Sequence, residues 1–290
     1  MIVTHTTIDL AAMIPTVRSV GWGAMEILRS YYHGSLAANL DVQENKKDGP
    51  VTAADKAANH YILEKLQAAF GLEQFGYLSE ETHVGSEPLP QDWVWIIDPL
   101  DGTRDFIDRT GEYALHIALA YQQHPVLAVV GVPEAEKLYF AVQGQGTFVE
   151  TQSGELQKIE LSPQPTLDSL TLVVSRTHRD QRFQDLIERL PFSDRHYVGS
   201  VGCKIVAILE KQADIYISLS GKSAAKDWDF AAPELILTEA GGKFTYFNGE
   251  AVTYNRGDVR QWGGIFASNG SFHEKLCQES LDILAEIDQA

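Results

Sequence analysis

The segment Trp93-Val94-Trp95-Ile96-Ile97-Asp98-Pro99-Leu100-Asp101-Gly102-Thr103 leads an apolar, β-prone run into a turn that carries two aspartates and is closed by a threonine. Pro99 and Gly102 restrict this turn, so the two carboxylates leave the end of the strand in fixed directions. Such a pair suits a hard divalent cation such as Mg²⁺, which takes oxygen ligands and shares its shell with substrate phosphates. A β-turn alone explains one aspartate, but it does not explain the combination of a strand, two aspartates and a closing threonine. The segment therefore predicts the floor of a metal-dependent phosphate-ester site.

Around this segment the hydrophobic pattern divides the chain into two parts. Helices are expected over 9–32 and 53–70, with Pro15 suggesting a break or a late start in the first. Turn-separated strands predict a mostly antiparallel sheet, with members at 93–98, 114–121, 125–133, 137–142 and 146–150. Beyond them strands and helices alternate, which predicts an α/β layer. We expect subdomains 1–160 and 161–290, with the site between them.

The overall composition limits the possible partners. The chain has 290 residues, and its 40 acidic and 23 basic side chains give a formal net charge of −17. This argues against a nucleic-acid polymer or an anionic membrane surface as the main partner. A small anionic substrate stays compatible, because bound divalent ions offset nearby carboxylates. Only Cys203 and Cys277 are present, and no signal peptide or membrane span is recognised, so we expect a cytoplasmic protein without disulfides.

Three further acidic segments are candidates for the same site, although each also has a purely structural explanation. Glu80 and Glu81 follow a short apolar stretch and are compatible with a solvated turn. Asp55 forms a threonine-x-x-acid capping box with Thr52, which would account for both residues. Asp229 lies near an expected helix start, where the helix dipole favours an acid. Taken one at a time, these segments are explained by structure.

Taken together, the segments resemble a known superfamily. The Glu80-Glu81 pair, the Asp-Pro-Leu-Asp-Gly-Thr turn at 98–103 and the Trp-Asp-x-Ala-Ala-Pro segment at 228–233 occur in that order and far apart. This arrangement is similar to the lithium-sensitive, magnesium-dependent phosphatase superfamily of inositol monophosphatases, fructose-1,6-bisphosphatases and 3′(2′),5′-bisphosphate nucleotidases. The resemblance implies an α/β fold with an α+β N-terminal half, layered as an αβαβα sandwich of the inositol monophosphatase and fructose-1,6-bisphosphatase type.

The resemblance also assigns roles to the matching positions. Thr103 and Asp55 would align and deprotonate the attacking water, Glu81 would be a weaker participant, and Li⁺ would inhibit. No covalent nucleophile is needed, because phosphoryl transfer depends mainly on in-line positioning and charge stabilisation. Two or three Mg²⁺ ions would be held by Glu80, Asp98 (bridging two ions), the backbone carbonyl of Leu100, Asp101 and Asp229.

Three local features favour a nucleotide with two phosphates. Arg104-Asp105-Phe106 resembles the continuation of this turn in bisphosphate nucleotidases, and Ser175-Arg176-Thr177-His178 resembles their strand-end motif that holds nucleotides. Gly199-Ser200-Val201-Gly202-Cys203-Lys204 presents helix-start amides and a lysine to an anion. The alternatives are a solvated Lys204 and an ordinary loop at 175–178. The candidate substrate-binding residues are Asp101, Gly102, Thr103, Arg176, His178, Ser200, Lys204 and Asp229.

Three smaller features receive structural interpretations. His116 is expected to be a satisfied structural histidine, and Cys203 a buried thiol. Residues 33–51 are polar and loop-like, with a mobile tip at 44–50 as the default interpretation; a lid that helps to hold a third ion is the alternative.

The expected function is hydrolysis of the 3′-phosphate of adenosine 3′,5′-bisphosphate to AMP and phosphate. The related 3′-phosphoadenosine 5′-phosphosulfate is a second expected substrate. One alternative is a phosphatase acting on inositol monophosphates or on sugar phosphates such as fructose 1,6-bisphosphate. Another is a phosphometabolite-binding regulator without turnover, which the full set of carboxylates disfavours. Whether the protein is a monomer or a homodimer is left open by the sequence.

Overall fold

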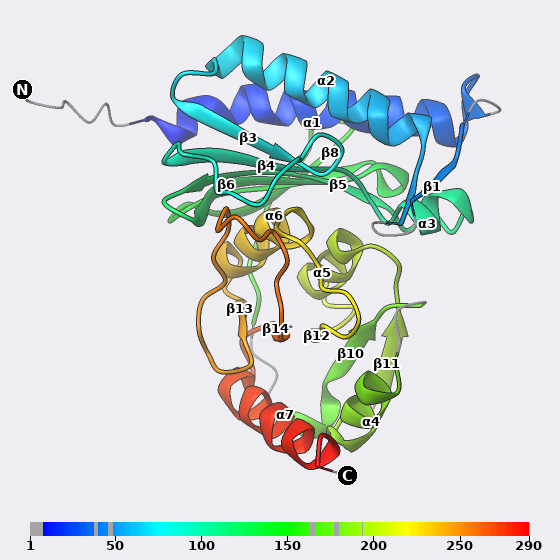
Figure 1. Cartoon of the computed structure of the whole chain (residues 1–290), viewed down its shortest axis with the longest axis vertical. Coiled ribbons are helices and arrows are strands. Elements are labelled where there is room, and N and C mark those ends of the chain that lie inside the picture. Colours follow the sequence, from blue (N-terminus) through cyan, green and yellow to red (C-terminus); the bar gives the residue numbers. More distant parts are fainter. Residues whose placement is uncertain are drawn as a thin grey trace, which may run out of the picture.

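The protein is an alternating stack of helices and sheets (Figure 1). The structure is a computed structural model that describes residues 8–37, 40–45, 49–162, 166–176, 180–192 and 194–289. The αβαβα sandwich expected from the sequence is confirmed. Its layers are, in order, α1 (Leu10–Tyr32) with α2 (Ala53–Phe70), a seven-stranded sheet, α5 (Val201–Leu209) with α6 (Asp227–Glu239), a five-stranded sheet, and α4 (Gln181–Arg189) with α7 (His273–Ile287).

The seven-stranded sheet contains the segment quoted first. Its strand order is β3-β4-β5-β6-β7-β8-β9, and all neighbours are antiparallel except β3 with β4, so the expected mostly antiparallel sheet is confirmed. The sequence pattern does not predict the edge strand β9, because its side chains are largely exposed and show no buried alternation. The strands are β3 (Phe75–Ser79), β4 (Trp93–Asp101), β5 (Ala114–Tyr121), β6 (His124–Val132), β7 (Lys137–Val142), β8 (Gly146–Thr151) and β9 (Leu156–Ile159).

The second sheet is mixed and forms the α/β layer expected from the alternating pattern. Its order is β11-β10-β12-β14-β13; β10 is parallel to β11 and β12, and β14 is antiparallel to β12 and β13. Its strands are β10 (Thr171–Val174), β11 (Asp194–Tyr197), β12 (Ile215–Leu219), β13 (Lys243–Tyr246) and β14 (Gly264–Ser268); the short helices are α3 (Thr103–Ile107), η2 (Pro133–Ala135) and η3 (Leu167–Ser169).

Two local expectations are wrong. Helix α1 is continuous through Pro15, which is exposed near its N-terminus. A proline there removes one backbone hydrogen bond, while Val17, Ala24 and Leu28 hold the helix by packing into the apolar core. The region expected to be a loop contains a short antiparallel ladder of β1 (Gln43–Asn45) and β2 (Gly49–Val51). Residues 46–48 of the tip at 44–50, for which a lid is the alternative interpretation, lie outside the described residues.

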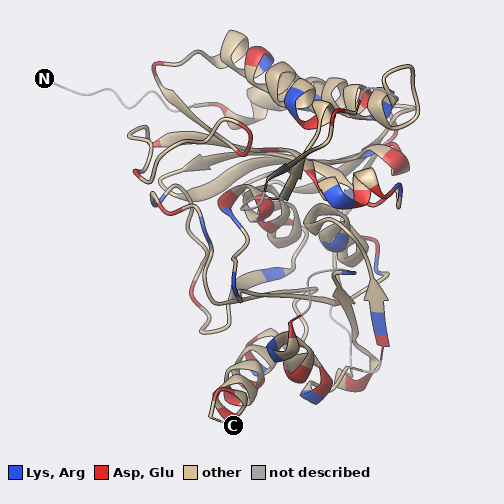
Figure 2. Ribbon diagram, turned by 45° about the vertical axis from the view of Figure 1, so that its right-hand side comes forward, with Lys and Arg blue, Asp and Glu red and all other residues tan. Residues whose placement is uncertain are grey.

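One apolar cluster joins the two halves of the chain. Helices α5 and α6 pack between the sheets, so Val94 and Val130 share a core with Ile205, Phe230 and Ile265. The division into subdomains 1–160 and 161–290 stays a prediction. Figure 2 shows charged residues along the outer helices and loops, whereas the sheet interior is largely uncharged. Among the described residues, none of the helices combines the length and the apolar character that crossing a bilayer requires.

Candidate active site

The site is built on an irregularity in β4. Asp98 pairs with His116 of β5 and Asp101 pairs with Ala114, so the register shifts between the two aspartates. Pro99 lies in this bulge, where its missing N–H breaks no regular ladder. Gly102 follows with φ +88°, a left-handed conformation that glycine adopts without strain. The bulge and the glycine direct two successive acids toward the end of the sheet.

Hydrogen bonds within the turn fix its polar groups. Asp98 Oδ1 accepts the Leu100 N–H at 3.0 Å. The Thr103 hydroxyl lies 3.1 Å from the Leu100 carbonyl oxygen and 3.1 Å from Asp55 Oδ1, and it can donate to either. Asp55 comes from the first turn of α2. The pair predicted to handle the attacking water is therefore in direct contact, next to a carbonyl predicted to be a metal ligand.

Three carboxylates meet at the end of β4. Oxygens of Asp98, Asp101 and Asp229 all lie within 4.8 Å of one another. Asp229 comes from the first turn of α6, a helix that packs against β4 and β5. Glu80 lies beside this trio: it follows β3, and its N–H donates to the carbonyl of Ile97 at 3.1 Å. Three segments that are far apart in the sequence thus converge, as a shared metal site requires.

Burial and mutual repulsion hinder ionisation of Glu80, Asp98 and Asp229. Burial and the neighbouring Asp229 raise the pKa of Glu80 to about 8. The pKa of Asp98 lies well above its usual value because the carboxyl is buried beside Glu80 and Asp101. Burial and Asp101 raise the pKa of Asp229 to about 6. A divalent cation among hard oxygen donors would relieve this repulsion, so the donor set fits Mg²⁺.

Asp55 and Asp229 combine a structural and a site role. Asp55 Oδ2 accepts the Thr52 N–H at 2.8 Å, which completes the capping box of α2, while Oδ1 faces Thr103. Asp229 Oδ2 accepts the Lys226 N–H at 2.6 Å at the start of α6. Each acid caps its own helix with one oxygen. The structural explanation is correct for both residues and leaves the second oxygen for chemistry.

His116 is a site residue that the sequence interpretation missed. Its ring is buried, with Nδ1 3.1 Å from the Trp228 carbonyl oxygen. Nε2 lies 3.2 Å from Asp101 Oδ2, in the geometry of an ion pair rather than of an aligned hydrogen bond. Burial alone would raise the pKa of Asp101, but His116, Lys204 and the Gly202 N–H hold it below its usual value. Its pairing with Asp98 across β4 and β5 is known only once the strand register is known, so no local sequence signal identifies it.

The helix-start segment before α5 differs from the expectation. The Gly202 N–H donates to Asp101 Oδ2 at 2.7 Å, and the Cys203 N–H donates to Ser200 Oγ at 2.9 Å. These two amides are therefore bound within the protein instead of being presented to an anion. Ser200 is the N-cap of α5. The Cys203 thiol is buried, as expected, and burial raises its pKa to about 12.

Lys204 is not the solvated lysine considered as an alternative. Its side chain is buried, and Nζ donates to the backbone carbonyls of Gly199 and Ser200. It therefore closes the turn that precedes α5. Direct contact between Lys204 and a substrate stays a prediction.

Arg176 follows β10 and is joined to a residue that the sequence interpretation did not select. Its guanidinium pairs with the carboxylate of Glu112, with Nε 2.8 Å from Oε2. His178 lies outside the described residues. The substrate-binding roles of Arg176, Ser200 and Gly102 also stay predictions.

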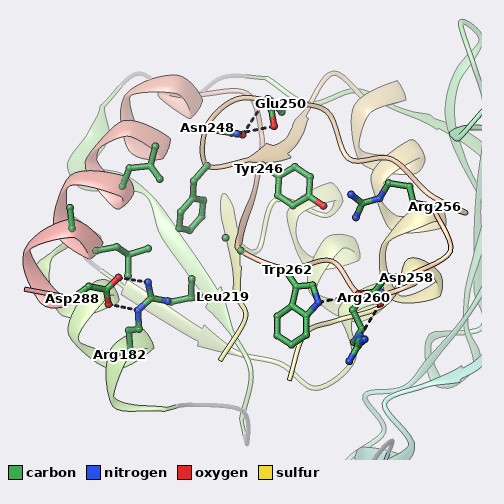
Figure 3. Close-up of a pocket in the computed structure, with 16 residues that line it drawn as sticks. Arg182, Leu219, Tyr246, Asn248, Glu250, Arg256, Asp258, Arg260, Trp262 and Asp288 are labelled. Atoms are coloured by element: carbon green, nitrogen blue, oxygen red, sulfur yellow. Dashed lines mark hydrogen bonds and ion pairs between the residues drawn. The ribbon is translucent and has the colours of Figure 1, made fainter. Parts of the chain in front are cut away.

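A hollow elsewhere in the molecule lacks this chemistry (Figure 3). It has a volume of about 740 Å³ and is lined by residues of the second half, including Tyr246, Arg256 and Trp262. None of the predicted site residues is among the described residues that line it. Its acids Asp288 and Asp258 lie 2.7 and 2.8 Å from arginines of the same pocket.

Comparisons with known proteins agree with the geometry. The model of the inositol monophosphatase family matches residues 9–285. A 3′(2′),5′-bisphosphate nucleotidase CysQ from Aggregatibacter actinomycetemcomitans is 31% identical over 250 residues, which cover 84% of this chain and 88% of that protein. The protein of the same name from Salmonella typhimurium is 32% identical, with coverage of 83% and 94%.

Solved structures give the same fold. An IMPase from Thermotoga maritima superposes with a TM-score of 0.76 at 21% identity, covering 96% of this chain and 99% of that one. An inositol monophosphatase from Anabaena gives a TM-score of 0.73 at 22% identity, with coverage of 95% and 97%. At these identities the likeness shows the fold alone.

Proposed function

Because this chain belongs to the inositol monophosphatase family, we propose that it is a Mg²⁺-dependent phosphomonoesterase that hydrolyses the 3′-phosphate of adenosine 3′,5′-bisphosphate to AMP and phosphate. One observation carries the reaction class: carboxylate oxygens of Asp98, Asp101 and Asp229 lie within 4.8 Å of one another. Ionised acids packed this closely repel one another, and a multivalent cation among them would relieve that repulsion. Relatives that are named bisphosphate nucleotidases, at 31% and 32% identity over most of the chain, support the choice of substrate.

Each part of the site has a role in this reaction. Magnesium held by Glu80, Asp98, the Leu100 carbonyl, Asp101 and Asp229 would neutralise phosphoryl oxygens and lower the pKa of a bound water. Asp55 and Thr103 handle the proton of the attacking water. The Thr103 hydroxyl, 3.1 Å from Asp55 Oδ1, donates to that carboxylate and can accept a proton from water as it passes its own on. Burial raises the pKa of Asp55, although hydrogen bonds from Thr52 and Thr103 oppose the shift, and a raised pKa favours uptake of a proton.

The second phosphate needs positive charge beyond the metal ions. Arg176 lies at the end of β10, and Ser200 and Lys204 lie at the start of α5. We assign recognition of the 5′-phosphate to this side of the site, while Gly102, Thr103, Asp101 and Asp229 lie on the side of the scissile phosphate. The 5′-phosphosulfate analogue has an anionic group at the same place and is a second proposed substrate.

A substrate panel tests the proposal. Initial rates of phosphate release are measured with Mg²⁺ for adenosine 3′,5′-bisphosphate, inositol 1-phosphate and fructose 1,6-bisphosphate. We expect the largest kcat/KM for the nucleotide and no release when Mg²⁺ is removed by a chelator. A larger kcat/KM for either of the other esters would overturn the substrate assignment. Tight nucleotide binding without any phosphate release would indicate a binding protein instead of an enzyme.

A further inference from the structure

Glu112 connects three segments that come from different parts of the sequence. It lies in the loop between α3 and β5. Its carboxylate pairs with the guanidinium of Arg176, and Oε2 also accepts the Gly199 N–H at 2.7 Å. Its backbone carbonyl accepts the Ser200 N–H at 3.2 Å. One residue of the first half thus binds both segments of the second half that are assigned to the distal phosphate.

The same residue also contacts the catalytic turn. A Cβ built on Gly102 would lie 2.9 Å from Ser200 Cβ and 3.1 Å from the Glu112 carbonyl oxygen. The backbone of the turn at Gly102 therefore lies close to both Glu112 and Ser200. A displacement of Glu112 would therefore shift the Arg176 guanidinium and the Gly199–Ser200 turn, which lies against Gly102.

The ion pair between Glu112 and Arg176 restricts the orientation of the guanidinium more than it stabilises the fold. The side chains of Glu112 and Arg176 are 25% and 43% exposed, and ion pairs this accessible to water contribute little to the free energy of unfolding. A two-point Arg–carboxylate pair nevertheless restricts the orientation of the guanidinium. Here Nε and Nη2 face Glu112, so Nη1 is directed away from it.

We propose that Glu112 is a positioning residue that orients Arg176 and the Gly199–Ser200 turn toward the phosphate that is not cleaved. The inference rests on the proposed function, because it assumes a substrate with two phosphates. Glu112 would then act on the affinity for the distal phosphate and not on the chemical step. Its removal should change KM for a bisphosphate while leaving kcat and the KM for a monophosphate nearly unchanged.

The test compares Glu112→Gln with the wild type on two substrates, adenosine 3′,5′-bisphosphate and adenosine 3′-monophosphate, which lacks the distal phosphate. Glutamine keeps the length of the side chain and an oxygen for the Gly199 N–H, but it loses the charge. We expect KM for the bisphosphate to rise about tenfold, with less than about a twofold change in its kcat and in both constants for the monophosphate. Asp288→Asn is the matched control: it breaks another two-point arginine–carboxylate pair, with Arg182, and all four constants should stay unchanged.

A second variant shows whether Glu112 acts through its partner. Arg176→Ala should raise KM for the bisphosphate at least as much, and the double variant with Glu112→Gln should be no worse than Arg176→Ala alone. Equal changes for both substrates, a loss confined to kcat, or additive effects in the double variant would overturn the positioning role. A wild type that releases no phosphate from either nucleotide would instead remove the proposed function, and this inference with it.

Discussion

The acid cluster and the pocket of Figure 3 differ in how their charges are balanced. In the pocket, Arg182 pairs with Asp288 and Arg260 with Asp258, so each of these acids has a basic partner beside it. In the cluster, Asp98 is 1% exposed and lies next to other acids. These two pocket acids therefore need no ligand to balance their charge, and Glu250 of the same pocket accepts a hydrogen bond from the Asn248 amide. The buried acids of the cluster face one another, with His116 as a basic neighbour of Asp101, and this imbalance, more than the presence of a hollow, marks the site.

Among the variants that test the difference between the acid cluster and the pocket, Asp98→Asn should have the largest effect on activity. The amide keeps the volume of the side chain and the oxygen that accepts the Leu100 N–H. It removes the negative charge of the carboxylate that would hold the metal ions. We expect kcat to fall by about a thousandfold or more. In the absence of metal the variant should be at least as stable as the wild type, because the amide cannot ionise beside the other buried acids. Steady-state phosphate release and thermal unfolding in EDTA measure both effects; residual activity near the wild-type level would refute the role of Asp98.

Gly202→Ala should produce the next largest effect. A Cβ at this position would lie 2.5 Å from His116 Nε2 and 2.8 Å from Ala114 Cβ, so α5 must move away from β5. The Gly202 N–H would then lose its short contact with Asp101. We expect a loss of about 1–3 kcal/mol in the free energy of unfolding and about a tenfold decrease in kcat.

Gly21→Ala is the matched control for this variant. Its Cβ would lie 2.7 Å from Leu138 Cδ1, which overpacks α1 against the other face of the same sheet. The stability of this variant should fall by a similar amount while its kcat stays unchanged. A parallel loss of kcat in both variants would show that general destabilisation, and not the support of Asp101, explains the result.

The charge imbalance also predicts how stability depends on pH. In the folded protein the pKa values of Glu80, Glu81 and Asp229 are raised to about 8, 7 and 6, mainly by burial. Between about pH 4 and pH 8 the folded protein holds protons that the unfolded chain has released. The free energy of unfolding of the metal-free protein should therefore fall as pH rises through this window.

Magnesium should counteract this loss. Because the ion binds the ionised acids, its stabilising effect should be several degrees larger in Tm at pH 8 than at pH 6. Thermal unfolding with Mg²⁺ and with EDTA at the two pH values measures the difference. The same increase in Tm at both values would contradict the assignment of these acids to the metal site.

The smallest effect is expected in the pocket. Arg182→Ala breaks a partly exposed pair with Asp288, so the free energy of unfolding should change by about 1 kcal/mol or less. Activity on adenosine 3′,5′-bisphosphate should stay within about a factor of two of the wild type. A large decrease in kcat/KM would show that the pocket is coupled to catalysis and would break the contrast between the two regions.

The sequence predicts most of the fold and the metal-binding side of the site, because these depend on local signals. The apolar run before Asp98, the Pro99 turn, the capping box at Asp55 and the acid Asp229 near a helix start are each readable within a few residues. The resemblance then brings the distant acids together. The predicted break or late start at Pro15 is wrong, because packing of α1 against the sheet outweighs the loss of one backbone hydrogen bond.

The substrate-binding side of the site is harder to predict from the sequence, because its contacts join residues that are far apart in the chain. The pairing of Glu112 with Arg176 and Gly199, and the burial of Lys204, arise only when the loop before β5 meets the start of α5. A lysine after a glycine-rich turn has the same local pattern whether it is solvated or buried. The contact of His116 with Asp101 requires knowledge of the strand register.

The most direct test of the central claim, that the acids at the end of β4 bind divalent cations, is anomalous diffraction from crystals soaked in Mn²⁺. We predict anomalous peaks within about 2.5 Å of carboxylate oxygens of Asp98, Asp101 and Asp229. A map without a peak at these oxygens, at a Mn²⁺ concentration that supports turnover in solution, would contradict the account.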